Sequence, residues 1–174
     1  YGGLIGGFVG VTLWTLIRKV PLGIVANTMG PAVALGYAIG RIGCQLAGDG
    51  DYGKPSDLPW AMGYPNGTVP TDPGVTVHPT PVYEIIMMAP IIWILWRLAN
   101  KGRSGWWTFG WMLVLTGVER FFIEFLRIND QVALGLTQPQ WVALASVVIG
   151  TTLVLLFRRK PAERIAALRA PTSP

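Results

Sequence analysis

The chain has 174 residues, of which 51% are hydrophobic and only 13% are charged. Soluble domains carry about 25% charged residues, so this composition excludes an ordinary soluble domain and, with eight tryptophans, indicates a membrane protein. The net charge of +5 does not require a nucleic-acid partner, because basic residues mark the cytoplasmic side of membrane proteins, and the single cysteine excludes an internal disulfide and a thiolate metal cluster.

Five apolar segments approach the length of about 20 residues that a membrane helix needs. We predict that residues 1–174 form one integral-membrane domain, an all-α, polytopic transmembrane helical bundle. The chain begins without a methionine or a basic leader, so we expect further membrane helices to precede it in a longer protein. The expected spans are residues 4–17, 24–46, 83–98, 106–126 and 141–157.

The second span contains a polar stripe. The first segment ends at Arg18, and Pro21 separates it from the second, which is rich in glycine and alanine. Asn27, Tyr37 and Arg41 fall on one face of this second helix. Because a charged residue in a membrane helix is costly, we expect this stripe to face the bundle interior or a cavity.

Residues 47–82 are dominated by glycine, proline and aspartate and are predicted to form a long loop outside the membrane. His78 is either a general base or a loop residue with a local hydrogen bond. Asp49 and Asp51 either bind a cation or act as turn residues, and the lack of further ligand spacing favours the turn. Cys44 has no histidine nearby in the sequence, which favours an inert thiol over a nucleophile.

The fourth span carries charges at helical spacing. Arg120, Glu124 and Arg127 share one helical face, and Arg120 is spaced to pair with Glu124. This pair is either a structural ion pair or part of a site that also includes Arg41 and Glu84, which starts the third span. Guanidinium groups match phosphate oxygens and stay ionised, so the second alternative predicts a phosphate clamp.

The basic residues predict the orientation in the membrane. They cluster at residues 18–19, 97–103 and 158–169, which alternation of the five spans places on one side. The positive-inside rule makes that side cytoplasmic, with residues 158–174 as a cytoplasmic tail. The loop of residues 47–82 is then on the outer side.

Several stretches in chain order resemble the prolipoprotein diacylglyceryl transferase family. The family signature is similar to Gly-Arg-Ile-Gly at residues 40–43 and the acidic turn that closes at Gly53. Together the matches cover nearly the whole chain. The other similar stretches are residues 57–62, 78–84, 120–127 and 136–141.

The resemblance implies a seven-helix, multi-pass enzyme of the bacterial inner membrane, with its active site toward the periplasmic face and a long periplasmic loop. It implies transfer of the diacylglyceryl group from phosphatidylglycerol to the lipobox cysteine thiol of a prolipoprotein signal peptide, which releases glycerol phosphate. No metal or other cofactor is expected. The alternatives are a non-catalytic phospholipid-binding membrane protein and a small transporter.

The resemblance also assigns roles. It maps the lipid-binding arginine to Arg41, the second essential arginine to Arg120 and the acids to Glu84 and Glu124. With Arg41, Arg120 and Glu84, the catalytic candidates include His78 and Tyr1, which stands where the family often has a histidine considered a catalytic base. The substrate-binding candidates are Arg41, Asn27, Tyr37, Gly43, Asp49, Glu124 and Arg127.

The chain departs from the family pattern near both arginines. Cys44 replaces an asparagine, and Thr116 replaces a tyrosine that precedes the second arginine. The acidic turn is one residue longer and uses Asp49 and Asp51 where glutamate is usual. These positions are where we expect the site to differ from that of its relatives.

Overall fold

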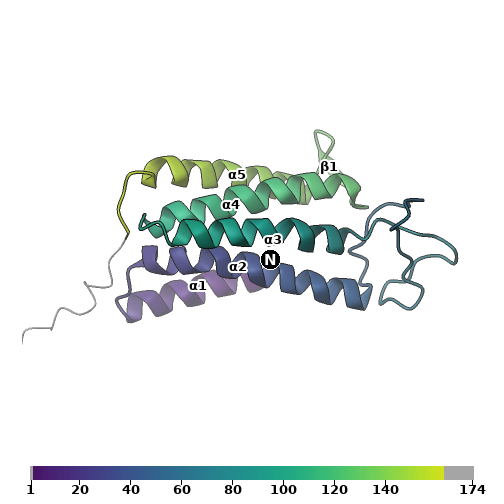
Figure 1. Cartoon of the computed structure of the whole chain (residues 1–174), viewed down its shortest axis with the longest axis horizontal. Helices are drawn as coiled ribbons and strands as arrows, with labels where there is room; N and C mark the ends of the chain where they lie inside the picture. Colours follow the sequence, from purple (N-terminus) through teal and green to yellow (C-terminus); the bar gives the residue numbers. More distant parts are fainter. Residues whose placement is uncertain (1, 163–174) are drawn as a thin grey trace, which may run out of the picture.

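The computed structural model describes residues 2–162, apart from the side chain of Leu4. Figure 1 shows the helices of this part of the chain lying side by side, with an irregular loop, residues 48–79, at one end. The predicted all-α bundle is therefore confirmed. Its helices are α1 (Gly2–Ile17), α2 (Leu22–Ala47), α3 (Thr80–Ala99), α4 (Gly105–Ile123) and α5 (Gln138–Phe157).

The end of α2 depends on a glycine. Gly48 has φ of +56°, a backbone conformation in which a residue with a side chain is strained. Its N–H donates to the carbonyl of Cys44 at 3.0 Å. A Cβ at Gly48 would also lie 2.8 Å from the Cα of Gly67 in the loop. Glycine is therefore required where the chain leaves α2 and the loop returns against it.

A small hairpin follows α4, which the sequence did not predict. The helix continues into the short 3-10 helix η1 (Glu124–Leu126), and β1 (Gln131–Ala133) then pairs antiparallel with β2 (Leu136–Thr137). Leu134 and Gly135 both have positive φ, at 51° and 73°, as a two-residue turn between twisted strands requires. The hairpin leads directly into α5, so it fixes where that helix begins.

Close glycine contacts join α4 to α5. A Cβ at Gly110 would lie 2.8 Å from the carbonyl oxygen of Gly150, and a Cβ at Gly117 would lie 2.9 Å from that of Ala143. Because glycine has no side chain, the two backbones can approach closely, as is common at small residues between helices in lipid.

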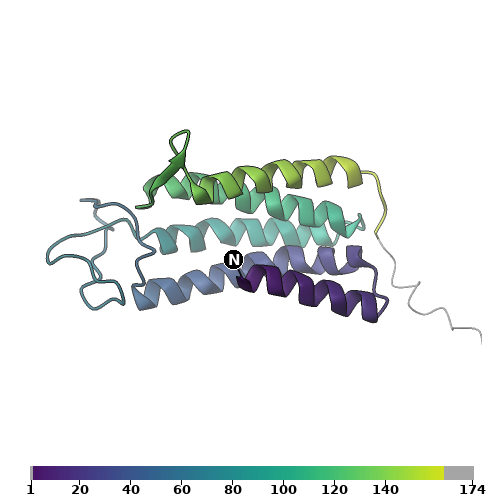
Figure 2. The same ribbon diagram turned by 180° about the vertical axis from the view of Figure 1, so that it is seen from behind.

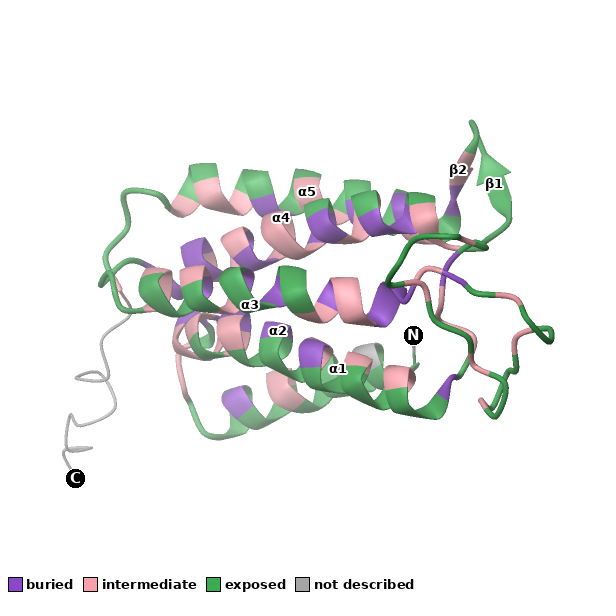
Figure 3. Ribbon diagram, turned by 45° about the vertical axis from the view of Figure 1, so that its right-hand side comes forward, coloured by how far each residue is buried: buried purple, intermediate pink, exposed green. Residues whose placement is uncertain are grey.

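The buried core lies between α2, α3 and α4, whereas the outer faces are exposed and apolar. Ala34, Met88 and Leu95 are almost completely buried at its centre, with Met112 against them. Figure 3 shows the buried residues on the faces between helices and the exposed residues on the outward faces. Large apolar side chains cover those outward faces, as lipid contact requires; examples are Ile39, Trp93, Trp96, Phe122, Val148 and Leu156.

Three helices are long and apolar enough to cross a membrane, namely α2, α3 and α5. The apolar segment of α1, Ile5–Ile17, is shorter than these three helices. Seen from behind in Figure 2, α1 lies beside α2 at the edge of the bundle. α4 is 19 residues long but carries Glu119 and Arg120. Spanning by α1 and α4 therefore stays a prediction.

The two ends of the bundle differ in charge. One end, here called the loop end, carries the loop of residues 48–79, the start of α3, the end of α4 and the hairpin (Figure 1). The opposite end, called the basic end, contains the links between α1 and α2 and between α3 and α4. The basic residues described there are Arg18, Lys19, Arg97, Lys101, Arg103, Arg158, Arg159 and Lys160.

Backbone hydrogen bonds fold the loop onto the bundle. Met62 and Val77 exchange backbone hydrogen bonds of 2.9 and 3.0 Å, and Lys54 N–H donates to the carbonyl of Leu126 at 2.8 Å. Gly53 forms an isolated antiparallel bridge with Arg127, and a Cβ at Gly53 would come within 2.9 Å of the Thr80 side chain. The loop therefore closes over the ends of α3 and α4.

Candidate functional site

An ion-pair cluster at the loop end brings together residues from α2, α3, α4, η1 and the loop. Its arginines lie in the C-terminal part of α2, in the last turn of α4 and just after η1. Each arginine contacts at least two carboxylates, and each carboxylate contacts at least two arginines. We call this group the arginine cluster; it comprises Arg41, Arg120, Arg127, Asp51, Glu84 and Glu124.

Glu84 is the hub of the arginine cluster. Its side chain is fully buried, and its Oε2 lies 2.6 Å from Nε of Arg41. Its Oε1 lies 3.0 Å from Nη1 of Arg120 and 3.9 Å from Nη1 of Arg127. Because a buried carboxylate is stable only when it is paired and hydrogen-bonded, these contacts explain how Glu84 is tolerated in the bundle.

Asp51 connects two arginines that are far apart in the sequence. Arg41 donates to its Oδ2 and Arg127 to its Oδ1, so each carboxylate oxygen has an arginine partner. Burial alone would raise the pKa of Asp51, but the hydrogen bond and charge of Arg127, together with the charge of Arg41, hold that pKa below its ordinary value. Asp51 is therefore ionised at neutral pH.

Asp51, and not the substrate-binding candidate Asp49, reaches the arginine cluster. Asp49, not Asp51, was the predicted substrate-binding acid, but Asp49 is exposed and its Oδ1 accepts the N–H of Asp51 at 3.2 Å. Asp49 thus acts as a turn residue, which agrees with the other reading of this pair. No sequence signal separated the two aspartates, because the path of the loop decides which one reaches the arginines.

Glu124 ties Arg120 to the hairpin and α5. The predicted pairing is confirmed, since Nη2 of Arg120 lies 2.9 Å from Oε2 of Glu124. The other oxygen, Oε1, accepts from Asn129 at 2.6 Å and from the Thr137 hydroxyl at 2.8 Å. Thr137 is the N-cap residue of α5, and its N–H donates to Oε1 of Gln140 at 3.0 Å. Glu124 is thereby held in one orientation toward Arg120.

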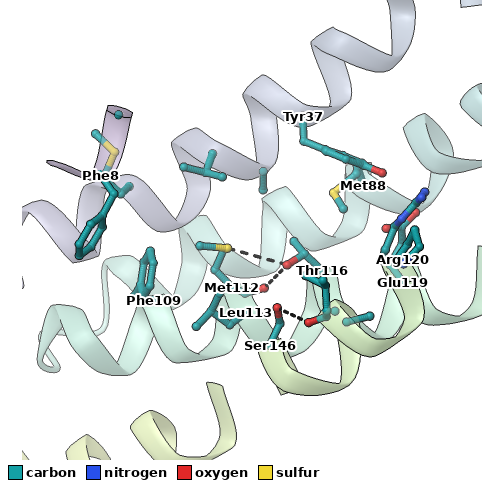
Figure 4. A pocket seen from close by; sticks show the side chains of 18 of the residues that line it. Phe8, Tyr37, Met88, Phe109, Met112, Leu113, Thr116, Glu119, Arg120 and Ser146 are labelled. Atoms are coloured by element: carbon teal, nitrogen blue, oxygen red, sulfur yellow. Dashed lines mark hydrogen bonds between the residues drawn. The ribbon is translucent and has the colours of Figure 1, made fainter. Parts of the chain in front are cut away.

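A cavity of about 930 Å³ extends from the arginine cluster into the bundle. Its walls come mainly from α1, α2, α4 and α5 and are apolar, with Phe8, Phe109 and Leu113 among them (Figure 4). Thr116 and Ser146 also line it, but their hydroxyls donate to carbonyls of their own helices, at 2.7 and 2.9 Å. Those hydroxyls are therefore satisfied and leave the walls effectively apolar.

Polar groups gather at one end of this cavity, the end nearest the arginine cluster. Arg41 and Arg120 line it there, and the Arg41 guanidinium carbon lies 4.7 Å from the centre of the Tyr37 ring. Glu119 joins them, as Figure 4 shows beside Arg120. The sequence analysis noted no role for Glu119, because nothing in its spacing showed that it borders a cavity.

Asn27 does not contact the arginine cluster. It lies 14 residues before Arg41 on α2, which is about 21 Å along a helix. Its side-chain amide donates to the carbonyl of Ala99 at 3.1 Å and its Oδ1 accepts from the Thr108 hydroxyl at 2.7 Å. Asn27 thus faces the bundle interior as predicted, but near the basic end, where it joins three helices.

Other candidates lie around the arginine cluster rather than in it. Nδ1 of His78 is 3.3 Å from the Tyr83 hydroxyl, which also accepts from the Trp60 indole at 2.7 Å. Gly43 is exposed on α2, with open space where a Cβ would lie. Tyr1 lies outside the described residues.

Cys44, Asp49 and Asp51 also lie close together, with one ligand atom of each within 4.8 Å of the others. A cation there would compete with two arginines, since Arg41 and Arg127 already bind both carboxylate oxygens of Asp51. This trio is therefore better suited to holding the turn than to holding a metal ion.

Two comparisons with known proteins, one with a family model and one with individual relatives, agree on the same family. The profile described as "Prolipoprotein diacylglyceryl transferase" matches residues 1–156. The chain is similar to proteins from three organisms that are named phosphatidylglycerol–prolipoprotein diacylglyceryl transferase. These are from Bordetella parapertussis (31% identity over 94% of this chain and 62% of the relative), Polynucleobacter necessarius (31% over 92% and 61%) and Dehalococcoides mccartyi (32% over 92% and 61%). The chain thus spans about three fifths of the length of these relatives. It belongs to the prolipoprotein diacylglyceryl transferase family.

Proposed function

We propose that the protein acts in the transfer of a diacylglyceryl group from phosphatidylglycerol to the lipobox cysteine of a prolipoprotein, with release of glycerol phosphate. The observation that supports this most is the apolar cavity of about 930 Å³ that ends at Arg41 and Arg120. A phospholipid has the same division into an apolar body and an anionic head. The cavity volume is within the usual range for small-molecule sites, about 300–1,000 Å³.

In this proposal Arg41 and Arg120 hold the phosphate of the lipid. Both guanidinium groups border the cavity and are kept in place by Glu84, which contacts both. Their donors suit the phosphate oxygens and would stabilise the negative charge that develops as the glycerol carbon–oxygen bond breaks. Glu124 orients Arg120, and Asp51 links Arg41 to Arg127.

The incoming peptide must present a thiolate, because a thiol is a poor nucleophile. Among the bases expected from the sequence, Glu84 is engaged by two arginines at 3.0 Å or less. His78 contacts Tyr83 at the surface of the loop end, and Tyr1 is outside the described residues. The reaction so proposed uses no metal or other cofactor, since arginine-held phosphate is a good leaving group.

The membrane orientation is part of the same proposal. The basic end would face the cytoplasm of a bacterium and the loop end the periplasm, because basic residues mark the cytoplasmic side. The arginine cluster would then lie near the periplasmic face of the inner membrane, where a secreted prolipoprotein presents its lipobox. The loop of residues 47–82 would help to position the signal peptide.

The test is product analysis with the full-length protein in vesicles that contain labelled phosphatidylglycerol and a lipobox peptide. Arg41→Ala should reduce thioether formation by about 100-fold or more, and Arg41→Lys should also be poor because lysine lacks the planar fork. Arg97→Ala, which removes an arginine at the basic end, is the matched control and should retain activity. Wild-type protein that binds the lipid without forming thioether would instead support a phospholipid-binding function, and lipid flux without product would support a transporter.

A further inference from the structure

Glu119 is a buried acid that the proposed clamp does not use. It lies in the last turns of α4 and is only 2% exposed. Its Oε1 has no hydrogen-bond partner among the described residues. Its side chain borders the cavity at the same end as Arg41 and Arg120, and Figure 4 shows it next to Arg120.

The other buried acids at this end, Glu84 and Glu124, form ion pairs with arginines, and no such pair is seen for Glu119 among the described residues. Glu84 contacts three arginines, and Glu124 contacts two arginines, Asn129 and Thr137. At longer range, the charges of Glu84, Arg120 and Arg41 all act on Glu119. A buried polar group without a partner is destabilising, and more so when it is charged. An ionisable group retained at such a cost inside a membrane protein indicates a function.

We infer that the Glu119 carboxylate accepts the proton of the attacking cysteine thiol, an inference that rests on the proposed transfer reaction. Three features support it. Glu119 borders the place where the lipid phosphate would bind, its Oε1 has no hydrogen-bond partner among the described residues and so can accept a proton, and it is supplied by the same helical turn as Arg120. A base must lie within hydrogen-bond reach of the proton it removes, and the cavity gives the thiol access to this carboxylate.

The step balances as follows. The thiol proton passes to the Glu119 carboxylate while the sulfur forms a bond to the terminal glycerol carbon of the diacylglyceryl group. The bond between that carbon and the phosphate oxygen breaks, and its electron pair stays on the oxygen, whose charge Arg41 and Arg120 stabilise. Glycerol phosphate leaves, and protonated Glu119 returns its proton to solvent or to the departing phosphate.

A purely electrostatic role for Glu119 predicts different behaviour. If Glu119 only balanced the charge of Arg120, its replacement would affect every thiol-like nucleophile to a similar extent. A proton acceptor, by contrast, is needed only for a nucleophile that arrives protonated. A selenocysteine peptide is already ionised at neutral pH, so it does not need the base.

The experiment compares cysteine and selenocysteine lipobox peptides with the full-length enzyme and its Glu119→Gln variant in phosphatidylglycerol vesicles. We expect Glu119→Gln to lower kcat for the cysteine peptide by about 100-fold or more, with little change for the selenocysteine peptide. The acid limb of the kcat/KM profile for cysteine should disappear as well. Asp130→Asn, the same chemical change at an exposed acid, is the control and should leave both rates unchanged.

The outcomes separate the inference from the proposed function. Equal cysteine activity in wild type and Glu119→Gln, or equal losses with both peptides, would overturn the proton-acceptor role. If the wild-type protein forms neither thioether nor selenoether, the proposed transfer itself fails. If Glu119→Gln does not fold, Glu119→Asp replaces it; its shorter carboxylate should slow the cysteine reaction and spare the selenocysteine reaction, and equal slowing would contradict the inference.

Discussion

The two ends of the bundle use arginine in opposite ways. At the loop end Arg41, Arg120 and Arg127 are largely buried, and each is paired with carboxylates. At the basic end Arg97 stacks over Trp93 with 4.8 Å between its guanidinium carbon and the ring centre, and Arg103 stacks over Trp107 at 4.7 Å. All eight acids within residues 2–162 lie in the loop-end half of the molecule.

This difference shows where the chain tolerates desolvated charge. Basic side chains at a membrane surface keep their charge in water and need no partner. The arginine cluster requires every member to be matched, because an unpaired buried charge is strongly destabilising. The same matching places the arginines at the end of the cavity, so stability and the proposed lipid site depend on one set of contacts.

The largest effect is expected from breaking the hub of the arginine cluster. Glu84→Gln removes a charge that contacts Arg41 and Arg120 at 3.0 Å or less, leaving both with fewer partners. The free energy of unfolding should fall by about 3–5 kcal/mol, the usual cost of removing one partner from a buried ion pair. Denaturant titration in detergent, followed by circular dichroism, measures it.

The control for this change is Asp57→Asn, at an exposed loop acid, which should alter the free energy of unfolding by less than about 0.5 kcal/mol. Similar stability of the Glu84→Gln variant and this control would show that the arginine cluster contributes no more to the fold than surface charges do. The arginines at the two ends would then differ in where they lie but not in how much they contribute to stability.

The middle of the bundle should respond to packing rather than to charge. A Cβ at Gly110 would meet the carbonyl oxygen of Gly150 at 2.8 Å, so Gly110→Val must separate α4 from α5. We expect a loss of about 1–3 kcal/mol in the free energy of unfolding. Gly36→Val, at a position on α2 with no heavy atom within 4 Å of the added Cβ, is the matched control. Equal losses would mean that helix propensity, not helix contact, sets the cost.

Asp51 tests the part of the arginine cluster that the loop supplies. Because its folded-state pKa lies below the ordinary value of 3.8, its contribution is complete above that pH and is lost as the pH falls through the lower folded-state value. Asp51→Asn should cost about 1.5 kcal/mol at neutral pH, as for a hydrogen bond to a charged group. The variant should also lose less further stability than wild type when the pH is lowered to about 3. Parallel pH profiles would exclude this role for Asp51.

What the sequence predicted well is local. Helical spacing was enough to pair Arg120 with Glu124, because residues four apart share a helical face. The position of Asp51 depends instead on contacts between the loop and η1, such as that of Lys54 with Leu126, which no periodicity encodes.

Helical periodicity also does not give the distance between two residues on the same face of a helix. Asn27 shares the inward face of α2 with Arg41, but a shared face says nothing about the separation of about 21 Å along the helix. Glu119 was overlooked for a related reason, since a cavity is formed by several helices and is visible only once they are packed. The sequence therefore singled out the arginines, Glu84 and Glu124 of the arginine cluster, whereas the places of Asp51 and Glu119 follow only from the folded structure.

The smallest effect is expected at the basic end, where an arginine has a ring instead of a carboxylate. Arg97→Gln removes the stacking over Trp93, whose own exposure is 57%, so the loss should be about 0.5–1 kcal/mol in the free energy of unfolding. Arg97→Lys keeps the positive charge and should therefore lose less of the free energy of unfolding than Arg97→Gln. Both variants should leave the proposed binding of phosphatidylglycerol unaffected, because Arg97 is separated from the arginine cluster by most of the length of α3. If Arg97→Gln lowered the free energy of unfolding as much as Glu84→Gln, a solvated arginine at the basic end would matter to stability as much as the buried ion pairs at the loop end, and the contrast between the two ends would not hold.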